Sequence, residues 1–429
     1  MLQDKQLVVG DAIEEFVGQI ESLANSLPLA MLAIQGAYRV AFKSYEEFVQ
    51  KHCEKQIRDD DTYIVVPFEH NDRYTVLNKR VQQTSTAYSA VPRSFQVSLV
   101  SSYDAFLGNL VSALFRIKPE LLKSSDRELT FSQLSDFGSI EEAKEYLLEK
   151  EVETLLRRSH SEQFDWLENK FAIKLRVDLP IWPTFIEVTE RRNLFVHSDG
   201  VVSRQYLKVC REHGVSLGAE TKQGLRLDVP HPYFRLAYEA LFEIGVKLGQ
   251  VLWRKLKPTD APDADANLSN LCYGLLKERN YRLAQKLLDF ACSPAMKHSD
   301  EKRRLIFLVN RALSYKWDNQ PSKALEIVKS EDWTATGAAF RLAAAVLQDQ
   351  FGDAISIMKT IGAEGEIHKV HYKTWPLFKE IRKAKEFRET FEEIFGEPIG
   401  KAAPLKKESL NPDKPDFDPG PETPPTVVN

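Results

Sequence analysis

The stretch Ile181–Gly200, IWPTFIEVTERRNLFVHSDG, decides the fold that we expect for this chain. Pro183 suits the first turn of a helix, where its missing N–H costs no hydrogen bond, and Gly200 suits the position just beyond a helix end. Between them, residues recur at spacings of four and three and form a seam: Ile181, Phe185, Val188, Arg192 and Phe195. The stretch therefore predicts a helix that packs into a helical bundle.

One member of this seam, Arg192, is charged. A buried guanidinium cannot lose its proton, so it needs an anionic partner or an opening to solvent. His197 follows in the last turn of the same helix, on the face that also carries Thr189 and Asn193. A five-residue step turns a side chain by about 140°, so Arg192 and His197 start from different faces. A long arginine and a loosened last turn could still bring them together.

A second informative helix is predicted at Ser94–Ile117, where two adjacent rows form one broad apolar face. One row consists of Val100, Asp104, Leu107, Val111 and Leu114, and the other of Leu99, Tyr103, Phe106, Leu110 and Ala113. Asp104 interrupts this face as Arg192 interrupts the other. Because a buried carboxylate is costly without a cation or a donor, we expect Asp104 to contact Arg192 across the bundle.

The segment Arg191–Val202, RRNLFVHSDGVV, resembles the signature of the HEPN superfamily. Ribonuclease members of this superfamily are all-α domains with an arginine, a polar residue, three further residues and a histidine at the end of a core helix. Arg192, Asn193 and His197 occupy these positions here, and the resemblance covers residues 30–257. An early core helix of such domains often carries an acidic or polar residue near the site. Asp104 fits that position more loosely, because SSYDAFL is not a strict motif.

The resemblance implies a metal-independent ribonuclease, with no cofactor and no metal ion, in which a ribose 2′-hydroxyl attacks the adjacent phosphate. His197 would accept or donate a proton, because an imidazole titrates near neutrality. Arg192 would neutralise the charge that develops on the phosphorane, and Asn193 would orient the phosphate or the imidazole. The resemblance also implies a homodimer with a composite cleft and a role as a bacterial toxin or anti-phage effector.

Other interpretations stay open from the sequence alone. Arg192 and Asp104 could form a structural ion pair, while His197 caps the helix at the end where cations are favoured. The chain would then be a non-catalytic interaction protein that dimerises through the same helix, since many HEPN proteins have lost activity. A third interpretation is a modification target, because partner nucleotidyltransferases silence some HEPN toxins.

The composition fits a soluble, multidomain protein of 429 residues. The net charge of −4 gives no overall attraction to nucleic acid, so RNA binding would need a local basic patch. Cys53, Cys210, Cys272 and Cys292 form no C-x-x-C pair, which argues against a zinc ribbon and fits a reducing cytoplasm. The acidic N-terminus does not resemble a signal peptide, and no apolar run approaches the roughly 20 residues of a membrane span.

The remaining elements give a first domain at residues 1–257, an HEPN-like helical bundle with small β-hairpin inserts. Pro28 is expected to end a first helix, and β-hairpins are expected within Asp59–Val81 and Gly214–Val229. Further helices are expected at Asp11–Leu27, Leu32–Arg58, Glu141–Arg158, Ser161–Ile173, Arg204–His213 and Pro232–Leu256.

A different organisation follows a predicted linker at residues 258–266, within KPTDAPDADAN. Residues 267–396 are expected to contain about three helical hairpins, whose second helices carry Ala284, Ala324 and Ala354 at tetratricopeptide-like spacing. Such repeats normally bind a protein partner, and an ordinary helical bundle is the alternative. Residues 397–429 are rich in proline and charge and are expected to be disordered.

Overall fold

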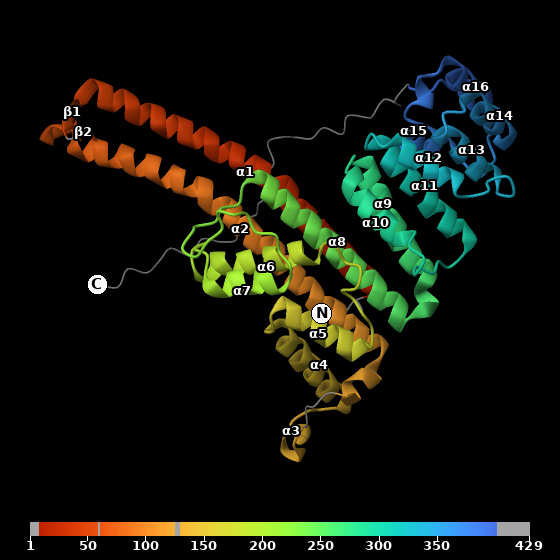
Figure 1. Cartoon of the computed structure of the whole chain (residues 1–429), viewed down its shortest axis with the longest axis horizontal. Coiled ribbons are helices and arrows are strands. Elements are labelled where there is room, and N and C mark those ends of the chain that lie inside the picture. Colours follow the sequence, from red (N-terminus) through yellow and green to blue (C-terminus); the bar gives the residue numbers. More distant parts are fainter. Residues whose placement is uncertain (1–7, 59–60, 125–128, 401–429) are drawn as a thin grey trace. The chain divides into compact units, whose positions relative to one another are not determined.

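The structure is a computed structural model that describes residues 8–58, 61–124 and 129–400. These residues are mainly helical, which confirms the all-α fold class, and they form two compact units, Met1–Ser330 (unit 1) and Glu331–Asn429 (unit 2) (Figure 1). The described elements are α1 (Val9–His52), β1 (Glu54–Arg58), β2 (Asp61–Val65), α2 (Asn71–Ile117), α3 (Phe131–Ser135), α4 (Ile140–Leu156), α5 (His160–Phe171), α6 (Trp182–His197), α7 (Arg204–Glu212), α8 (His231–Leu256), α9 (Ala261–Lys277), α10 (Tyr281–Ala291), α11 (Glu301–Trp317), α12 (Pro321–Lys329), α13 (Ala338–Leu347), α14 (Phe351–Ile361), α15 (Lys369–Thr374) and α16 (Lys385–Phe395), with short 3₁₀ turns between some of them.

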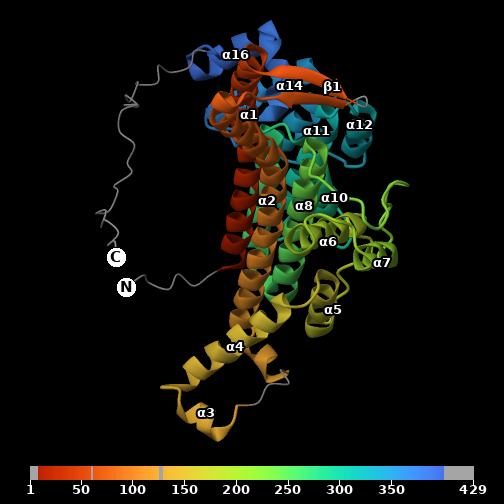
Figure 2. The same ribbon diagram turned by 90° about the vertical axis from the view of Figure 1, so that its left-hand side faces the viewer.

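The helices α1 and α2 form a long antiparallel pair, and β1 and β2 form an antiparallel hairpin at its tip (Figures 1 and 2). We call residues 28–92 of this pair the arm. The prediction that Pro28 ends a helix was wrong, because α1 continues through it. The predicted start of a helix at Ser94 was also wrong, because α2 begins at Asn71 and contains Pro92. Packing along the pair compensates for the hydrogen bonds that the prolines cannot make.

The register of the pair is set by aromatic contacts. Phe16 lies against Tyr103, with ring centroids 6.2 Å apart, and Tyr45 lies against Tyr74 at 5.8 Å. Both contacts fit a single antiparallel register, which places Pro28 of α1 level with Pro92 of α2. The segment RYTVL, which the sequence favoured as a strand, lies in α2, and only β1 and β2 remain of the first predicted hairpin.

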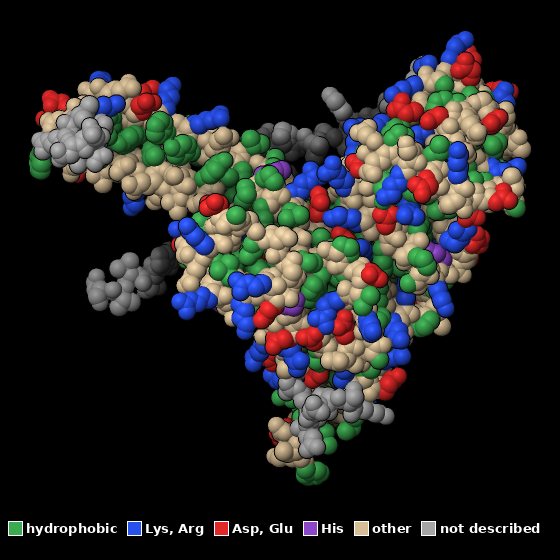
Figure 3. All heavy atoms as spheres, viewed as in Figure 1, with side chains coloured by type: hydrophobic (Ala, Val, Ile, Leu, Met, Phe, Trp, Pro, Cys, Tyr) green, Lys and Arg blue, Asp and Glu red, His purple; other side chains and the backbone are tan. Residues whose placement is uncertain are grey.

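Much of the arm is exposed. Leu29, Leu32 and Val40 are 68%, 64% and 63% exposed, and Figure 3 shows hydrophobic side chains along the arm. Two helices, Val9–His52 and Phe68–Ile117, each contain an 18-residue window of mean hydropathy 1.2, long and apolar enough to cross a membrane. The window in α2 is 56% buried, as in the core helix of a bundle, whereas the window in α1 is 17% buried. The absence of a membrane span therefore stays a prediction.

The core of unit 1 lies where α8 packs against α1 and α2 (Figure 2). Gly245 and Gly249 of α8 let α1 approach closely: a Cβ atom on Gly249 would lie 2.8 Å from Ile13, and one on Gly245 would overlap the ring of Phe16. The helices α6 and α4 both pack on α2. The predicted helices around α4, α5, α6 and α8 are all present.

The predicted hairpin at Gly214–Val229 was wrong. Within the described residues, this region has one isolated bridge, between Val201 and Arg226, and no strand. A small cluster is formed by residues of α6, α7 and the turn between them, namely Leu194, Val202, Tyr206 and Cys210. Val215, Leu217 and Leu227 of this region pack against it, together with Leu207 of α7. The alternation of apolar residues that predicted a hairpin here arises because these residues pack onto helices, and not because they pair in a sheet.

The predicted linker at residues 258–266 is instead helical, because Pro258–Asp260 form a 3₁₀ turn and α9 begins at Ala261. Asp265 and Asn267 are buried, and both are hydrogen-bonded to residues of α8. The chain therefore passes from α8 into α9 without an extended segment.

The expected helix pairs are present as α9–α10, α11–α12 and α13–α14. The first two pairs belong to unit 1 and the third to unit 2. Unit 2 has an aromatic core around the buried Tyr372, which lies near Phe378, Phe387, Phe391 and Phe395. Glu397, expected to begin a disordered tail, pairs with Lys369 at 2.9 Å and with Lys373. The predicted tail from residue 401 onward lies outside the described residues.

Candidate functional site

The helix that carries the motif, α6, begins and ends as its sequence indicates. Pro183 lies in its first turn, and the helix ends at His197. Gly200 has a φ of +80° and donates its N–H to the carbonyl of Leu194 at 3.0 Å. A Cβ atom at this position would lie 2.9 Å from the carbonyl oxygen of Leu227, so glycine is required here. This turn fixes where the last residues of α6 point.

Arg192 reaches across the bundle to Asp104, as predicted. Its Nη2 donates to Asp104 Oδ2 at 2.7 Å, from α6 to α2. The two side chains are 19% and 27% exposed, so the pair lies at the wall of an opening and not in the dry core. The Nε of Arg192 is buried without a hydrogen-bond partner in the described structure. The arginine therefore satisfies the carboxylate while one of its own donors stays free.

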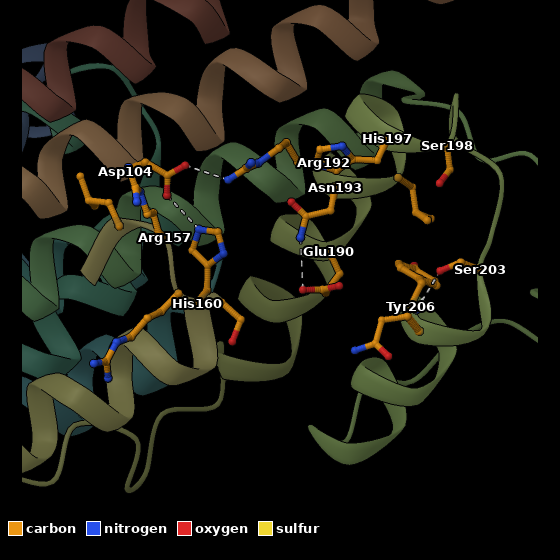
Figure 4. A pocket seen from close by; sticks show the side chains of 15 residues that line it. Asp104, Arg157, His160, Glu190, Arg192, Asn193, His197, Ser198, Ser203 and Tyr206 are labelled. Carbon is orange, nitrogen blue, oxygen red and sulfur yellow. Dashed lines mark hydrogen bonds and ion pairs between the residues drawn. The ribbon is translucent and has the colours of Figure 1, made fainter. Parts of the chain in front are cut away.

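The second oxygen of Asp104 binds a residue that the sequence did not single out. His160 Nε2 lies 3.0 Å from Asp104 Oδ1 (Figure 4). A carboxylate can only accept, so this nitrogen carries a hydrogen. His160 is the first residue of α5, behind the capping box of Ser159 and Glu162, and its side chain is only 6% exposed. Asp104 therefore holds a cation and an imidazole at the same time.

These residues line one pocket of ≈ 380 Å³. Its lining consists of Asp104, Leu156, Arg157, Arg158, Ser159, His160, Glu190, Arg192, Asn193, Leu194, His197, Ser198, Ser203, Gln205 and Tyr206. Three arginines and two histidines thus accompany two carboxylates. Although the whole chain is slightly acidic, this pocket has a local excess of basic side chains, as an anionic ligand requires.

The other two motif residues occupy the same pocket but do not join the Asp104 cluster. His197 is exposed at the end of α6, and no hydrogen bond of its side chain is recorded among the described residues. Asn193 Nδ2 donates to Glu190 Oε1 at 3.4 Å. Figure 4 shows the side chain of Arg192 directed toward Asp104, with His197 farther along α6. The structure thus brings Arg192 and Asp104 into contact and leaves His197 open to the pocket.

Glu190 adds a carboxyl group to the pocket. Burial raises its pKa, although the neighbouring His160, Asn193 and Arg192 favour the charged form. Neither Glu190 nor His160 belongs to the sequence motif. For Glu190 the available signal was its position one turn before Asn193 on the same helix, whereas nothing in the local sequence of His160 pointed to the site.

The end of α6 is anchored to α2 by Arg93. Arg93 Nη1 donates to Asp199 at 3.3 Å, its other nitrogens bind Asp228, and its guanidinium lies 5.7 Å from the centroid of the Phe195 ring. Asp199 also pairs with Arg226. These contacts surround the turn that follows His197 and hold it against the bundle.

The described residues contain no group of three or more His, Cys, Asp or Glu side chains that could hold a metal ion. Cys210 and His213, which are three residues apart, do not form such a group. Cys210 is buried, and Trp182 Nε1 donates to His213 Nδ1 at 3.4 Å. Comparisons with protein-family models, with curated proteins and with solved structures gave no match for this chain. The interpretation of the pocket therefore rests on its own residues.

Proposed function

We propose that this protein is a metal-independent RNA endonuclease of HEPN type. The observation that supports this best is that Arg192, Asn193 and His197, the three motif residues, all line one pocket rich in basic side chains. A phosphodiester would bind there through Arg157, Arg158 and Arg192, because guanidinium groups match the geometry of phosphate oxygens. RNA is then attracted locally by a protein whose total charge is negative.

Each pocket residue can take one role in the attack of a ribose 2′-hydroxyl on phosphorus. Arg192 would stabilise the charge that develops on the phosphorane. His197 would transfer a proton, since an imidazole can do so near neutral pH. Asn193 would hold the phosphate or the imidazole, and Asp104 would position Arg192.

We propose that two copies of the chain face each other at α6. His197 and Val196, which is 50% exposed, stand at the open end of this helix and would lie in the interface. A two-fold pairing would place two pockets side by side. The helix pairs after residue 261 would act as tetratricopeptide-like repeats that bind a protein partner, and the protein would act in the cytoplasm as a toxin or anti-phage effector.

The test is a cleavage assay in EDTA. Wild type, Arg192→Ala and His197→Ala would be incubated with tRNA and total RNA, and fragment ends would be analysed. Wild type should leave 2′,3′-cyclic phosphate ends, and each variant should be slower by at least about 100-fold. His213→Ala, a histidine outside the pocket lining, serves as the control and should cleave like wild type. Absence of cleavage by a folded, dimeric wild type would contradict the proposal.

The alternative is a non-catalytic interaction protein that dimerises through α6. It is favoured by one observation: the Arg192–Asp104 pair is already satisfied without a ligand, at 2.7 Å. In that case folded wild type would neither bind nor cut RNA. Measuring RNA binding and cleavage by folded wild type separates the two functions.

A further inference from the structure

We propose that His160 is a catalytic residue of the same pocket and acts as the general base, while His197 acts as the general acid. This inference rests on the proposed ribonuclease function. It assigns both proton transfers to one protomer, so that a dimer partner would not need to supply a histidine.

The first argument is the hydrogen bond to Asp104. Because His160 Nε2 carries the hydrogen that the carboxylate accepts at 3.0 Å, a neutral ring has its lone pair on Nδ1. Figure 4 shows this second nitrogen turned away from Asp104, toward the side of the pocket where Glu190 and Asn193 lie. A carboxylate behind an imidazole fixes its tautomer and stabilises the imidazolium that forms when the ring accepts a proton.

The second argument is that the ring is held in place. The Tyr103 ring centroid lies 6.0 Å from that of His160, and the Phe185 centroid lies 5.6 Å away at an interplanar angle of 83°. With 6% exposure, the side chain can be reached only through the pocket that it lines. A fixed base loses little orientational freedom when substrate binds.

The charged groups around His160 come from three parts of the chain. Asp104 faces it from α2, Glu190 and Arg192 face the pocket from α6, and Arg157 and Arg158 line the pocket just before α5. Asp104 accepts the ring N–H, and the arginines line the same pocket, where Arg192 also pairs with Asp104 and Arg157 with Glu153. The surroundings thus suit a group that must gain a proton next to a bound anion.

His197 suits the opposite role. It is exposed and lies at the C-terminal end of α6, where the helix dipole favours a cationic side chain. An imidazolium at this point can donate its proton to a leaving oxygen. The two histidines therefore reach the pocket from different helices, with His160 held by Asp104 and His197 exposed.

The reaction balances with these two groups alone. The bond between the ribose 2′-oxygen and phosphorus forms, and the bond between phosphorus and the 5′-oxygen breaks. The 2′-hydroxyl proton passes to Nδ1 of His160, and His197 gives a proton to the departing 5′-oxygen. The products are a 2′,3′-cyclic phosphate and a 5′-hydroxyl, and nothing is oxidised or reduced. Afterwards the protonation states of the two histidines are exchanged, and solvent restores them.

The experiment compares wild type, His160→Gln and His197→Gln on an RNA dinucleotide across pH 4 to 9. Glutamine at position 160 keeps an N–H donor for Asp104, which preserves the structural contact. Wild type should give a bell-shaped profile. His160→Gln should lower the maximal rate by about 100-fold or more and remove the acidic limb, and His197→Gln should remove the basic limb. His213→Gln is the matched control and should keep the bell shape.

A substrate with sulfur in place of the bridging 5′-oxygen assigns the roles. Its thiolate leaves without a proton, so His197→Gln should recover nearly the wild-type rate, whereas His160→Gln should stay slow. If His160→Gln keeps the bell-shaped profile while wild type cleaves, or if sulfur rescues His160→Gln instead, the inference is overturned and the proposed function stands. If folded wild type cleaves neither substrate, the proposed function fails and the inference fails with it.

Discussion

At the scale of residues, two neighbouring arginines of α6 contact different parts of the protein. Arg191 donates to Glu187 at 2.7 Å and lies 3.7 Å from the centroid of the Tyr233 ring. Glu187 is buried and also accepts from Tyr206 at 2.7 Å and Tyr233 at 2.8 Å. One step along the helix turns a side chain by about 100°, so Arg192 faces the pocket instead. Arg191 therefore holds α6 in the fold, which leaves Arg192 for the site.

The strength of the Arg192–Asp104 pair can be measured with a double-mutant cycle. Arg192→Ala should lower the free energy of unfolding by about 1–3 kcal/mol, because a partly buried carboxylate loses one of its two partners. The loss is moderate because His160 remains bound to Asp104. Urea unfolding of Arg192→Ala, Asp104→Ala and the double variant gives the coupling energy. Simple additivity of the two single effects would show that the pair contributes nothing.

At the scale of elements, α1 approaches α8 closely at two glycines of α8. Gly245 faces the ring of Phe16, and Gly249 faces Ile13. Phe16 also stacks on Phe106 of α2, with centroids 4.6 Å apart, so it cannot move away freely. The absence of a side chain at Gly245 thus determines how three helices meet.

Gly245→Ala should therefore destabilise the protein, even though alanine favours helix formation. We expect a loss of about 1–3 kcal/mol in the free energy of unfolding, because the added methyl group must displace a packed ring. Gly18→Ala on α1 is the matched control, since apart from the local backbone of α1 no atom of the described residues lies within 4 Å of its added Cβ. It should be neutral or stabilising by up to about 1 kcal/mol. Equal effects of the two substitutions on urea unfolding would contradict this account.

The sequence predicted elements well where periodicity alone decides them, as for α6 and α8. It failed at Pro28, which was taken as a helix end, and at Ser94, which was taken as a helix start, because Pro28 and Pro92 both lie within helices whose partner supplies the missing stability. It also predicted the contact between Asp104 and Arg192, because two charges interrupting two apolar faces need each other. His160 was missed because nothing in its local sequence pointed to the site, and only the path of α5 brings it to Asp104.

At the scale of the whole molecule, Asp265 connects the helical bundle to the helix pairs within unit 1. Its carboxylate is fully buried, and it accepts from Arg254 of α8 at 2.8 Å and from the backbone N–H of Ser299, two residues before α11 begins, at 2.7 Å. Burial would raise its pKa, but hydrogen bonds from His298, Ser299 and Arg254 outweigh burial and hold the pKa well below its usual range. The buried carboxylate of Asp265 thus lies in the segment that the sequence predicted to be a linker.

Asp265→Asn should lower the free energy of unfolding by about 3 kcal/mol at pH 7, because it leaves buried donors without a charge. A lowered pKa stabilises the fold above the pKa of the unfolded chain, and this contribution disappears as pH falls below about 4. The melting temperatures of wild type and variant should therefore converge between pH 5 and pH 2. Asp263→Asn, on the exposed face of the same helix, is the control. A difference in melting temperature between wild type and Asp265→Asn that does not change with pH would contradict the prediction.

The two helices of the arm each contain a proline at the same level, and the pair resists bending least there. Pro28 cannot donate to the carbonyl of Ala24, and Pro92 cannot donate to that of Tyr88, so both helices lack a backbone hydrogen bond at the same level. Bending there costs less than bending elsewhere along the pair. From Pro28 to His52 the helix runs about 36 Å, so a bend of about 10° displaces the tip by about 6 Å. A bend at this level would therefore move the hairpin at the tip and leave the pocket in place.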